Sequence, residues 1–306
     1  GAHAFFSQLT CEISPPEKGR MVVENLQEYP RYVKMAVSAT SGRNDMNNSN
    51  HVCEMRAPLP EMTNMILQGV VPPTQPTNPS RMNPDFSIKP LFCMNSGEGS
   101  ASYRQIGDVQ ISCTLNRNFG VLYGNDNGSN VTYALKDLKL RFTSSPDDGQ
   151  DSAIVLKSKV NIKQSIQSSF SNIQTRVPSK AVTAMTASFQ PQGEENSVSN
   201  NNYQLSKVPG LSKTQFLFSD STNKLISYEI RNISEVQDKA IDSMVDTGRN
   251  FLSMQNLNSN NGFLLGLDFQ GLYDLSSTKF SLQLTSGVLS SSPLIVYMYF
   301  HTVLEL

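Results

Sequence analysis

Tryptophan is absent from this sequence and histidine is scarce, with only three residues, His3, His51 and His301. Tryptophan supplies the large flat rings that stack on sugars and bases, so its absence weighs against such a binding site, although ten tyrosines remain. The three histidines stand far apart in the sequence. His301 lies inside a long β-prone run, and we interpret it as a strand residue rather than a catalytic base.

Short catalytic and ligand-binding motifs are also missing, including G-x-x-x-x-G-K-[ST], G-x-S-x-G, H-E-x-x-H and C-x-x-C. The glycine-rich residues 96–102 are followed by no helix pattern that would present amides to a phosphate, so we interpret them as a loop. Residues 125–128 and 147–151 carry oxygen ligands that suit calcium, but neither fits the calcium-loop pattern. We therefore predict that the protein is not an enzyme and has no catalytic, cofactor-binding or metal-ligating residues.

The chain has four cysteines, all within its first 113 residues: Cys11, Cys53, Cys93 and Cys113. Their spacings match no zinc site. Each lies among apolar or β-prone neighbours, as in L-F-C-M and I-S-C-T-L, which favours buried free thiols over disulfides.

Charge is low and nearly balanced, with 25 basic and 26 acidic residues and a formal net charge of −1. This balance predicts no nucleic-acid partner. Charged residues make up 17% of the chain, below the roughly 25% of a typical domain, whereas asparagine occurs 27 times. The resulting neutral polar surface repels its own copies weakly, which suits packing against other subunits.

Long apolar runs are missing as well. The longest, residues 294–300, falls far short of the roughly 18 residues of a membrane span, so we expect none. The first residues also lack the basic region and apolar core of a signal peptide.

Two halves differ in composition. Eleven of the 16 prolines and eight of the 12 methionines precede residue 95, and the later half is richer in serine and glutamine. The polar run T-S-S-P-D-D-G-Q-D-S at 143–152 separates two β-like runs. We therefore expect an N-terminal β-sandwich unit at 1–145 and a C-terminal jelly-roll unit at 153–306.

Period-two alternation of apolar and polar residues predicts strands in both halves. In the first half it predicts strands at 31–40, 109–115 and 138–143, with a hairpin turn within 120–133 and an extended proline-rich stretch at 58–90. In the second half it predicts strands at 153–166, 181–189, 214–218, 224–230, 263–269, 279–285 and a terminal strand within 290–306.

Helical spacing indicates one helix near 234–247. Ser234 and Gln237 form a possible capping box at its start, and Gly248 can end it. About fifteen short strands with one helix are typical of an all-β antiparallel sandwich or barrel.

The order of elements from Lys224 onward resembles the closing half of a viral capsid jelly roll: L-I-S-Y-E-I, a helix, F-L-L-G-L-D-F, K-F-S-L-Q-L-T and the terminal strand L-I-V-Y-M-Y-F-H-T-V-L-E-L. Size and composition are most similar to virophage-type penton (vertex) proteins of double-stranded DNA viruses. The resemblance implies a structural protein of the virion capsid shell, assembled in the host cell. Its partners would be identical subunits, with a pentamer favoured and a trimer possible, and the major capsid protein.

In a jelly roll the last strand lies inside a sheet, beside the first strand of its own roll. The resemblance therefore implies a terminal strand covered on both faces, with Tyr297, Tyr299 and His301 on one face and Val296, Met298 and Phe300 on the other.

Two arrangements of the chain remain open. With two units, the terminal strand pairs with residues 153–166. With one roll that carries an inserted upper β domain, it pairs near residues 5–13 or 32–38.

Three other functions also remain open. A small double-jelly-roll major capsid protein would be a trimer. A β-sandwich adhesin or lectin-like module would expose Tyr103, Tyr123 or Tyr273 around a groove. A β-sandwich hydrolase would need a pocket that joins an acid to His51 or His301.

Overall fold

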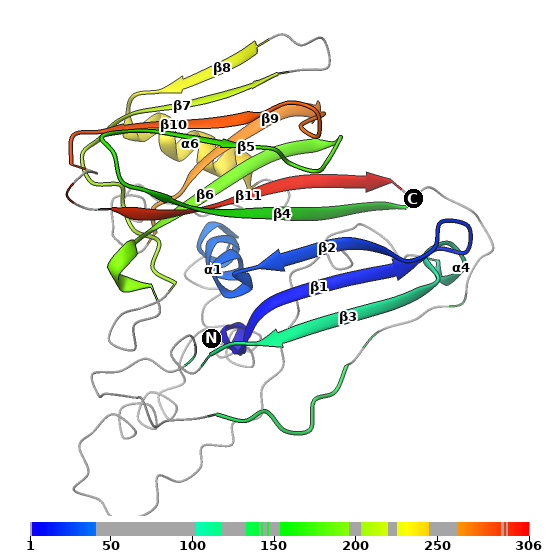
Figure 1. The fold of residues 1–306 in the computed structure, drawn as a ribbon. Coiled ribbons are helices and arrows are strands. Elements are labelled where there is room, and N and C mark those ends of the chain that lie inside the picture. Colours follow the sequence, from blue (N-terminus) through cyan, green and yellow to red (C-terminus); the bar gives the residue numbers. More distant parts are fainter. Residues whose placement is uncertain are drawn as a thin grey trace, which may run out of the picture.

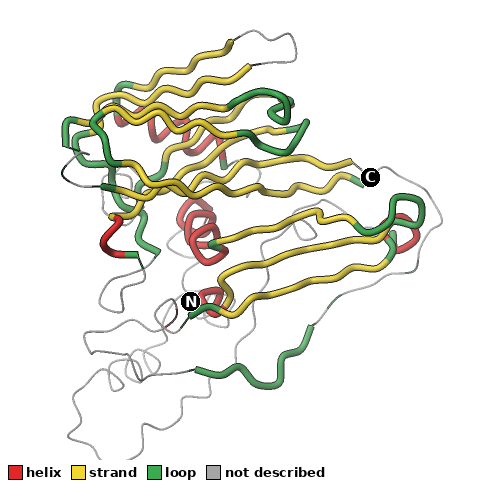
Figure 2. Tube along the Cα trace, viewed as in Figure 1, coloured by secondary structure: helices red, strands yellow, loops and turns green. Residues whose placement is uncertain are grey.

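A computed structural model describes residues 2–40, 102–117, 121, 133–140, 142, 146, 154–195, 203–219, 225–244, 262–288, 291 and 293–305. Most of these residues belong to two β-sheets that lie face to face (Figure 1). Loops and short helices connect the strands (Figure 2).

The second half of the chain folds as an antiparallel jelly roll. Its eight strands are β4 (Val155–Ile166), β5 (Phe170–Thr175), β6 (Val182–Pro191), β7 (Leu211–Ser219), β8 (Leu225–Ile230), β9 (Leu265–Tyr273), β10 (Phe280–Ser286) and β11 (Leu294–Glu305). One sheet has the order β4-β11-β6-β9 and the other β5-β10-β7-β8. The pairs β4·β11, β5·β10, β6·β9 and β7·β8 are those of one long hairpin rolled up on itself, which is the jelly-roll topology.

The first half adds three strands to the first of these sheets. They are β1 (Phe6–Ser14), β2 (Met21–Gln27) and β3 (Asp108–Leu115), in the order β3-β1-β2. β1 pairs with both neighbours antiparallel, whereas β2 meets β4 in parallel at a single pair, Asn25 and Val160. The result is a seven-stranded sheet, with short helices η1 (Ala2–Phe5) and α4 (Tyr103–Ile106) beside its first strands.

β11 separates two apolar cores. Val296, Met298 and Phe300 face the interior of the roll, while Tyr297 and Tyr299 pack with the first half of the chain. Both predicted faces of the terminal strand are therefore confirmed as covered. The strand lies between β4 and β6, and its partner β4 is the one expected from two units rather than from an insertion.

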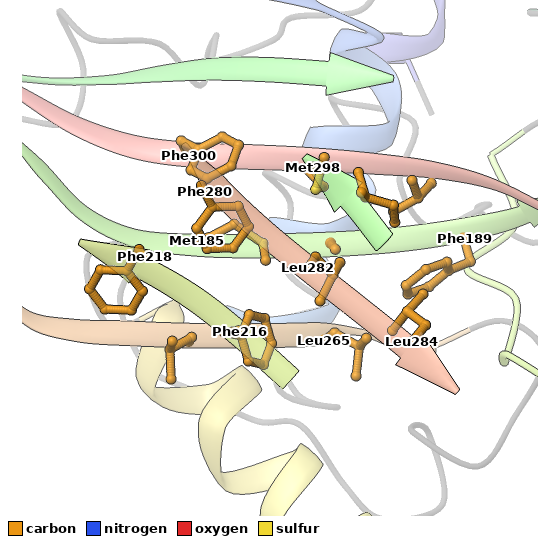
Figure 3. Packing of buried hydrophobic residues seen from close by; sticks show 14 of the residues in the cluster. Met185, Phe189, Phe216, Phe218, Leu265, Phe280, Leu282, Leu284, Met298 and Phe300 are labelled. Atoms are coloured by element: carbon orange, nitrogen blue, oxygen red, sulfur yellow. The ribbon is translucent and has the colours of Figure 1, made fainter. Parts of the chain in front are cut away.

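The interior of the roll is rich in phenylalanine (Figure 3). The rings of Phe280 and Phe300 pack edge to face across the two sheets, with 5.0 Å between their centroids. The rings of Phe218 and Phe269 are stacked, with 4.6 Å between their centroids. Such pairs contribute about 0.5–1.5 kcal/mol beyond the area they bury. Its buried residues are Ile166, Ile173, Val177, Val182, Met185, Ala187, Phe189, Val208, Phe216, Phe218, Ile230, Val236, Phe263, Leu265, Leu267, Phe269, Leu275, Phe280, Leu282, Leu284, Leu294, Val296, Met298 and Phe300.

Helix α6 (Ile233–Ser243) confirms the predicted helix but begins earlier than expected. Asn232, not Ser234, is the N-cap: its Oδ1 accepts a hydrogen bond from the Glu235 backbone at 2.9 Å. The Glu235 carboxylate in turn accepts a hydrogen bond from the Arg231 backbone N–H at 3.1 Å. The capping box is therefore formed by Asn232 and Glu235, two residues before the predicted pair Ser234 and Gln237. Gly248, the predicted end, lies outside the described residues.

The prediction of a strand at 31–40 is wrong. These residues lie in a second helix, α1 (Tyr29–Thr40), so the expectation of a single helix is wrong too. Tyr29, Tyr32, Val33 and Ala36 are buried at helical spacing, and Pro30 suits the first turn of a helix. The helix is buried on more than one side, so it carries apolar residues beyond a single helical stripe. These additional apolar residues produce the period-two pattern from which a strand was predicted.

Strands predicted at 109–115 and in seven places after residue 152 are confirmed as β3, β4, β6, β7, β8, β9, β10 and β11. β2 and β5 were not predicted, because M-V-V-E-N-L-Q and F-S-N-I-Q-T alternate weakly. Residues 138–140 and 142 lie outside both sheets, contrary to the strand predicted at 138–143. Most of the predicted turn at 120–133 and all of 58–90 lie outside the described residues.

The cysteine prediction is correct for one of the two cysteines that the structure describes. Cys11 is a buried free thiol, whereas Cys113 is free but exposed, because β3 is an edge strand. Cys53 and Cys93 lie outside the described residues.

Gly266, on β9, allows α6 to approach the sheet closely. A Cβ added there would lie 2.0 Å from Ser243 Oγ and 3.0 Å from Ala240 Cα. We expect Gly266→Ala to lower the free energy of unfolding by about 1–3 kcal/mol, because an overpacked contact forces backbone shifts. Chemical denaturation measures this. Gly193→Ala, whose added Cβ meets nothing within 4 Å, should change stability by less than about 0.5 kcal/mol; equal losses in both variants would contradict the close packing.

Candidate functional site

The histidines do not form a catalytic arrangement in the described residues. His301 is buried on β11, with its Nε2 3.5 Å from Thr186 Oγ1 and its ring 6.4 Å from that of Tyr32. His3 is buried, with its Nδ1 2.8 Å from the Tyr29 hydroxyl. His51, the other base considered for a hydrolase, lies outside the described residues. His301 is thus a strand residue, as interpreted from the sequence.

The tyrosines considered for a lectin-like groove are not brought together. Tyr103 is exposed beside β3, and its hydroxyl donates to Asp108 at 2.9 Å, which raises the pKa of Tyr103. Tyr273 lies on β9 and packs edge to face on Phe218 and Phe269. β3 and β9 are the opposite edges of the seven-stranded sheet, so these two rings do not line one groove. Tyr123 lies outside the described residues.

Within the described part of the chain, no group of three or more His, Cys, Asp or Glu residues could hold a metal ion. The two calcium candidates, 125–128 and 147–151, lie outside that part. Of the helices described, none has the length and apolar character that a membrane crossing requires.

The most distinctive polar arrangement is the junction of the N-terminal strands with the roll, which we call the β2–β4 seam (Val23–Gln27 with Ser158–Asn161). Because the backbones pair only at Asn25 and Val160, side chains supply most of its hydrogen bonds. Ser158 Oγ donates to the Val23 carbonyl at 2.6 Å, and the Gln27 amide donates to Asn161 Oδ1 at 2.9 Å. Side-chain bonds of this kind depend on residue identity, unlike a backbone ladder.

An ion pair is buried in the seam. Glu24 Oε1 accepts the Lys159 backbone N–H at 3.1 Å and lies 4.0 Å from Lys159 Nζ, and both side chains are almost fully buried. Lys159 Nζ also lies 5.4 Å from the centre of the Tyr32 ring. Burying two charges costs solvation free energy, so such a pair contributes more to a defined geometry than to stability, and removing one partner is costly.

Arg31, from α1, is fully buried beside the seam. Its Nη1 donates to the Gln204 carbonyl at 2.8 Å, and its Nη2 donates to Gln190 Oε1. The guanidinium carbon lies 3.9 Å from the centre of the Tyr297 ring, within the range of a strong cation–π contact. One side chain thus ties α1 to β6, to β11 and to the loop before β7.

Lys163 approaches the same Tyr297 ring, with its Nζ 5.5 Å from the ring centre. Lys163 also pairs with Glu195 and lies 3.8 Å from Glu28, while the Tyr297 hydroxyl donates to Glu195 at 3.2 Å. Arg31 and Lys163 bring positive charge close to the Tyr297 ring, and Glu28 and Glu195 bring negative charge. The net charge around the ring is therefore close to zero.

Burial shifts several pKa values around this junction. It raises the pKa of Tyr203 to about 12, and it also raises the pKa values of Tyr297 and Tyr299, so all three hydroxyls are neutral at physiological pH. The Tyr299 hydroxyl donates to the Glu28 carbonyl at 3.2 Å. On α1, burial and then the charge of Arg31 lower the pKa of Lys34 to about 8.

The sequence prediction of no site residues did not anticipate this junction. Glu24, Arg31 and Lys159 each have one apolar neighbour in the sequence, Val23, Tyr32 and Val160, and a charged residue at a buried position of a strand or helix is the signal that could have drawn attention to them. The arrangement holds two parts of the chain in one geometry.

The sequence matches no protein-family model and no curated protein. Among solved structures, the chain is similar to the crystal structure of PBCV-1 VP54 that was fitted into a cryo-EM reconstruction of the virophage Sputnik. The TM-score is 0.52 at 10% identity, over 100% of this chain and 82% of that chain. At this identity the likeness shows a shared fold.

Two further solved structures give lower scores. The Faustovirus major capsid protein has a TM-score of 0.34 at 10% identity, over 66% of this chain and 38% of that chain. The major capsid protein P2 of bacteriophage PM2 has a TM-score of 0.33 at 8% identity, over 99% of this chain and 83% of that chain. At these scores the fold comparison rests on VP54.

Replacing Arg31 by lysine should destabilise the protein strongly. We expect Arg31→Lys to lower the free energy of unfolding by about 2–4 kcal/mol, because lysine cannot both stack flat on Tyr297 and reach two acceptors. Urea denaturation measures the loss. The control is Arg231→Lys, at an exposed position, which should cost less than about 0.5 kcal/mol. A loss as small as that of the control would show that Arg31 does not secure the junction.

Lys34 should make stability rise with pH. Above about pH 8 the folded protein releases the Lys34 proton, whereas the unfolded chain keeps it until near 10.5, so the unfolded state binds more protons in this window. Stability should therefore increase from pH 8 toward pH 10 by up to about 1.4 kcal/mol per pH unit.

Denaturation at several pH values across that window measures the slope. Lys34→Met should be more stable near neutral pH and lose most of the slope. Lys18→Met, at an exposed turn, should keep it. An unchanged slope in Lys34→Met would assign the pH dependence to other groups.

Proposed function

We propose that this protein is a structural subunit of an icosahedral virus capsid that assembles with copies of itself in the virion. The observation that carries the proposal is the complete jelly-roll strand order of residues 155–305, together with a likeness to VP54 that extends over the whole chain. VP54 was itself fitted into the reconstruction of a virus particle. We infer a non-enzymatic role, which agrees with the buried position of His301.

The mechanics of the roll suit such a role. β4 and β11 each have 12 residues and pair along their whole length, which corresponds to a wall about 40 Å long at about 3.3 Å per residue. β11 is covered on both faces, so the wall has little freedom to bend. A rigid subunit loses little conformational entropy on assembly, and weak contacts then sum over a closed shell.

We further propose that the chain comprises two units, 1–145 and 153–306. The small amount of backbone pairing between β2 and β4 supports this division, because strands within one unit pair over several residues. The roll would be the C-terminal unit, and β1, β2 and β3 would belong to the N-terminal one.

Two roles within a capsid are candidates. The resemblance of residues 224–306 to virophage vertex proteins favours a pentameric penton that contacts the major capsid protein. The whole-chain likeness to VP54 favours instead a small major capsid protein that forms trimers. The two differ in copy number, which can be measured directly.

Native mass spectrometry over a concentration series tests the function. We expect a discrete, closed oligomer: five copies would support the vertex subunit and three the major capsid protein. The same series on Arg31→Lys should show weaker assembly if the junction must be rigid. Chains that stay monomeric at every concentration and salt condition would contradict a shell role.

A further inference from the structure

The outer edge of β3 is open in the described structure. β3 ends the order of the seven-stranded sheet and pairs only with β1 among the described strands. Its second edge therefore presents backbone N–H and C=O groups that another strand could pair with.

The apolar face of the sheet continues onto β3 and is exposed there. Val109 and Ile111 lie opposite Ile13 and Cys11 of β1, which are fully buried. On β3, however, Val109 is 40% exposed and Leu115, on the same face, is 52% exposed. An apolar surface that is buried on one strand thus emerges into solvent on the next.

The chain also has a strand-like segment without a sheet. Leu138, Leu140 and Phe142 alternate with polar residues, and their exposed fractions are 68%, 70% and 82%. These are among the most exposed large apolar side chains of the described residues. The segment runs apart from β3 and from both sheets (Figure 1).

The beginning of this segment is attached near the end of β3. The Tyr133 hydroxyl donates to the Asn116 carbonyl, directly after β3, and its ring lies 5.3 Å from that of Phe5. Leu135 packs partly against the adjoining core. Beyond that anchor, residues 138–140 and 142 belong to neither sheet.

The open edge and the segment are complementary. A sheet edge needs a strand to satisfy its backbone groups, and the period-two pattern of 138–142 puts three apolar side chains on one face of such a strand. Paired with β3, those side chains would extend the exposed apolar face formed by Val109, Ile111 and Leu115. Both surfaces would leave water in one contact.

We propose that residues 138–142 of one copy pair with the open edge of β3 of a neighbouring copy. This inference rests on the proposed function, which supplies the neighbour. The second copy is the favoured occupant because the segment leaves its own β3 uncovered although its anchor lies at the end of that strand. Each copy both offers and accepts a strand, so the contact can continue from subunit to subunit around a closed ring.

A disulfide trap tests the contact. Cys113 is an exposed thiol on the apolar face of β3, and Leu140→Cys places a second thiol on the segment. Cys53 and Cys93 are replaced by serine. Isotopically heavy and light chains are mixed before assembly and oxidised mildly, and the joined peptides are identified by mass spectrometry. We expect disulfides between heavy and light chains in statistical proportion.

Disulfides only within single chains would overturn the proposal, since the segment would then cover its own β3. Assemblies that form without this disulfide would overturn the contact and leave the shell function standing. Chains that remain monomeric would overturn both. Leu225→Cys, at an exposed position on β8, is the matched control and should not join to Cys113.

A second variant gives an independent readout. Leu138, Leu140 and Phe142 are exposed, so their joint replacement by serine should leave unfolding unchanged while assembly weakens by at least about tenfold. The control replaces three exposed apolar residues of the roll, Phe170, Leu225 and Leu272, by serine. Equal weakening in both variants would show that general surface hydrophobicity, and not this strand, drives assembly.

Discussion

Burial of both faces of β11 is the constraint on which the rest of this structure depends. One face closes the phenylalanine-rich interior of the roll, and the other supports Tyr297 and Tyr299 against the first half of the chain. A strand covered on two sides cannot alternate apolar and polar residues, which is why the most apolar run of the sequence stands here. Because β11 also pairs with β4 and β6 along most of its length, it holds both the sheet and the two cores in place.

Different interactions stabilise the two sides of β11. Inside the roll, apolar burial and stacked rings are tolerant of exchange as long as volume is conserved. At the β2–β4 seam, a buried ion pair, a buried arginine and side-chain hydrogen bonds replace the backbone ladder. Such polar contacts cost solvation and add little net stability, but they are satisfied in only one geometry. The seam therefore sets how the N-terminal strands sit on the roll.

The described part of the fold consists mainly of long strands in two sheets. His301 lies on one of them, with its Nε2 3.5 Å from Thr186 Oγ1, and Tyr103 and Tyr273 lie at opposite edges of the larger sheet. What the fold offers is a stiff wall of long strands and, on β3, an edge that a further strand can extend. A low net charge and a surface rich in asparagine reduce repulsion between copies that lie close together. These features agree with the proposed assembly of identical copies.

The sequence by itself determined seven of the eight strands of the roll, because the alternation of a half-buried strand and the continuous apolar run of β11 are both local properties of the chain. The weakly alternating β5 was missed. The sequence also determined the existence of α6, although the N-cap is Asn232 rather than Ser234. Only the tertiary structure decided that residues 29–40 form a helix. Because this helix is buried on several sides, its apolar residues fit both the 3.6-residue period of a helix and the two-residue period of a strand. The tertiary structure alone brought Arg31 to Tyr297 and Glu24 to Lys159, because contacts between residues more than 130 positions apart leave no periodic trace in the chain.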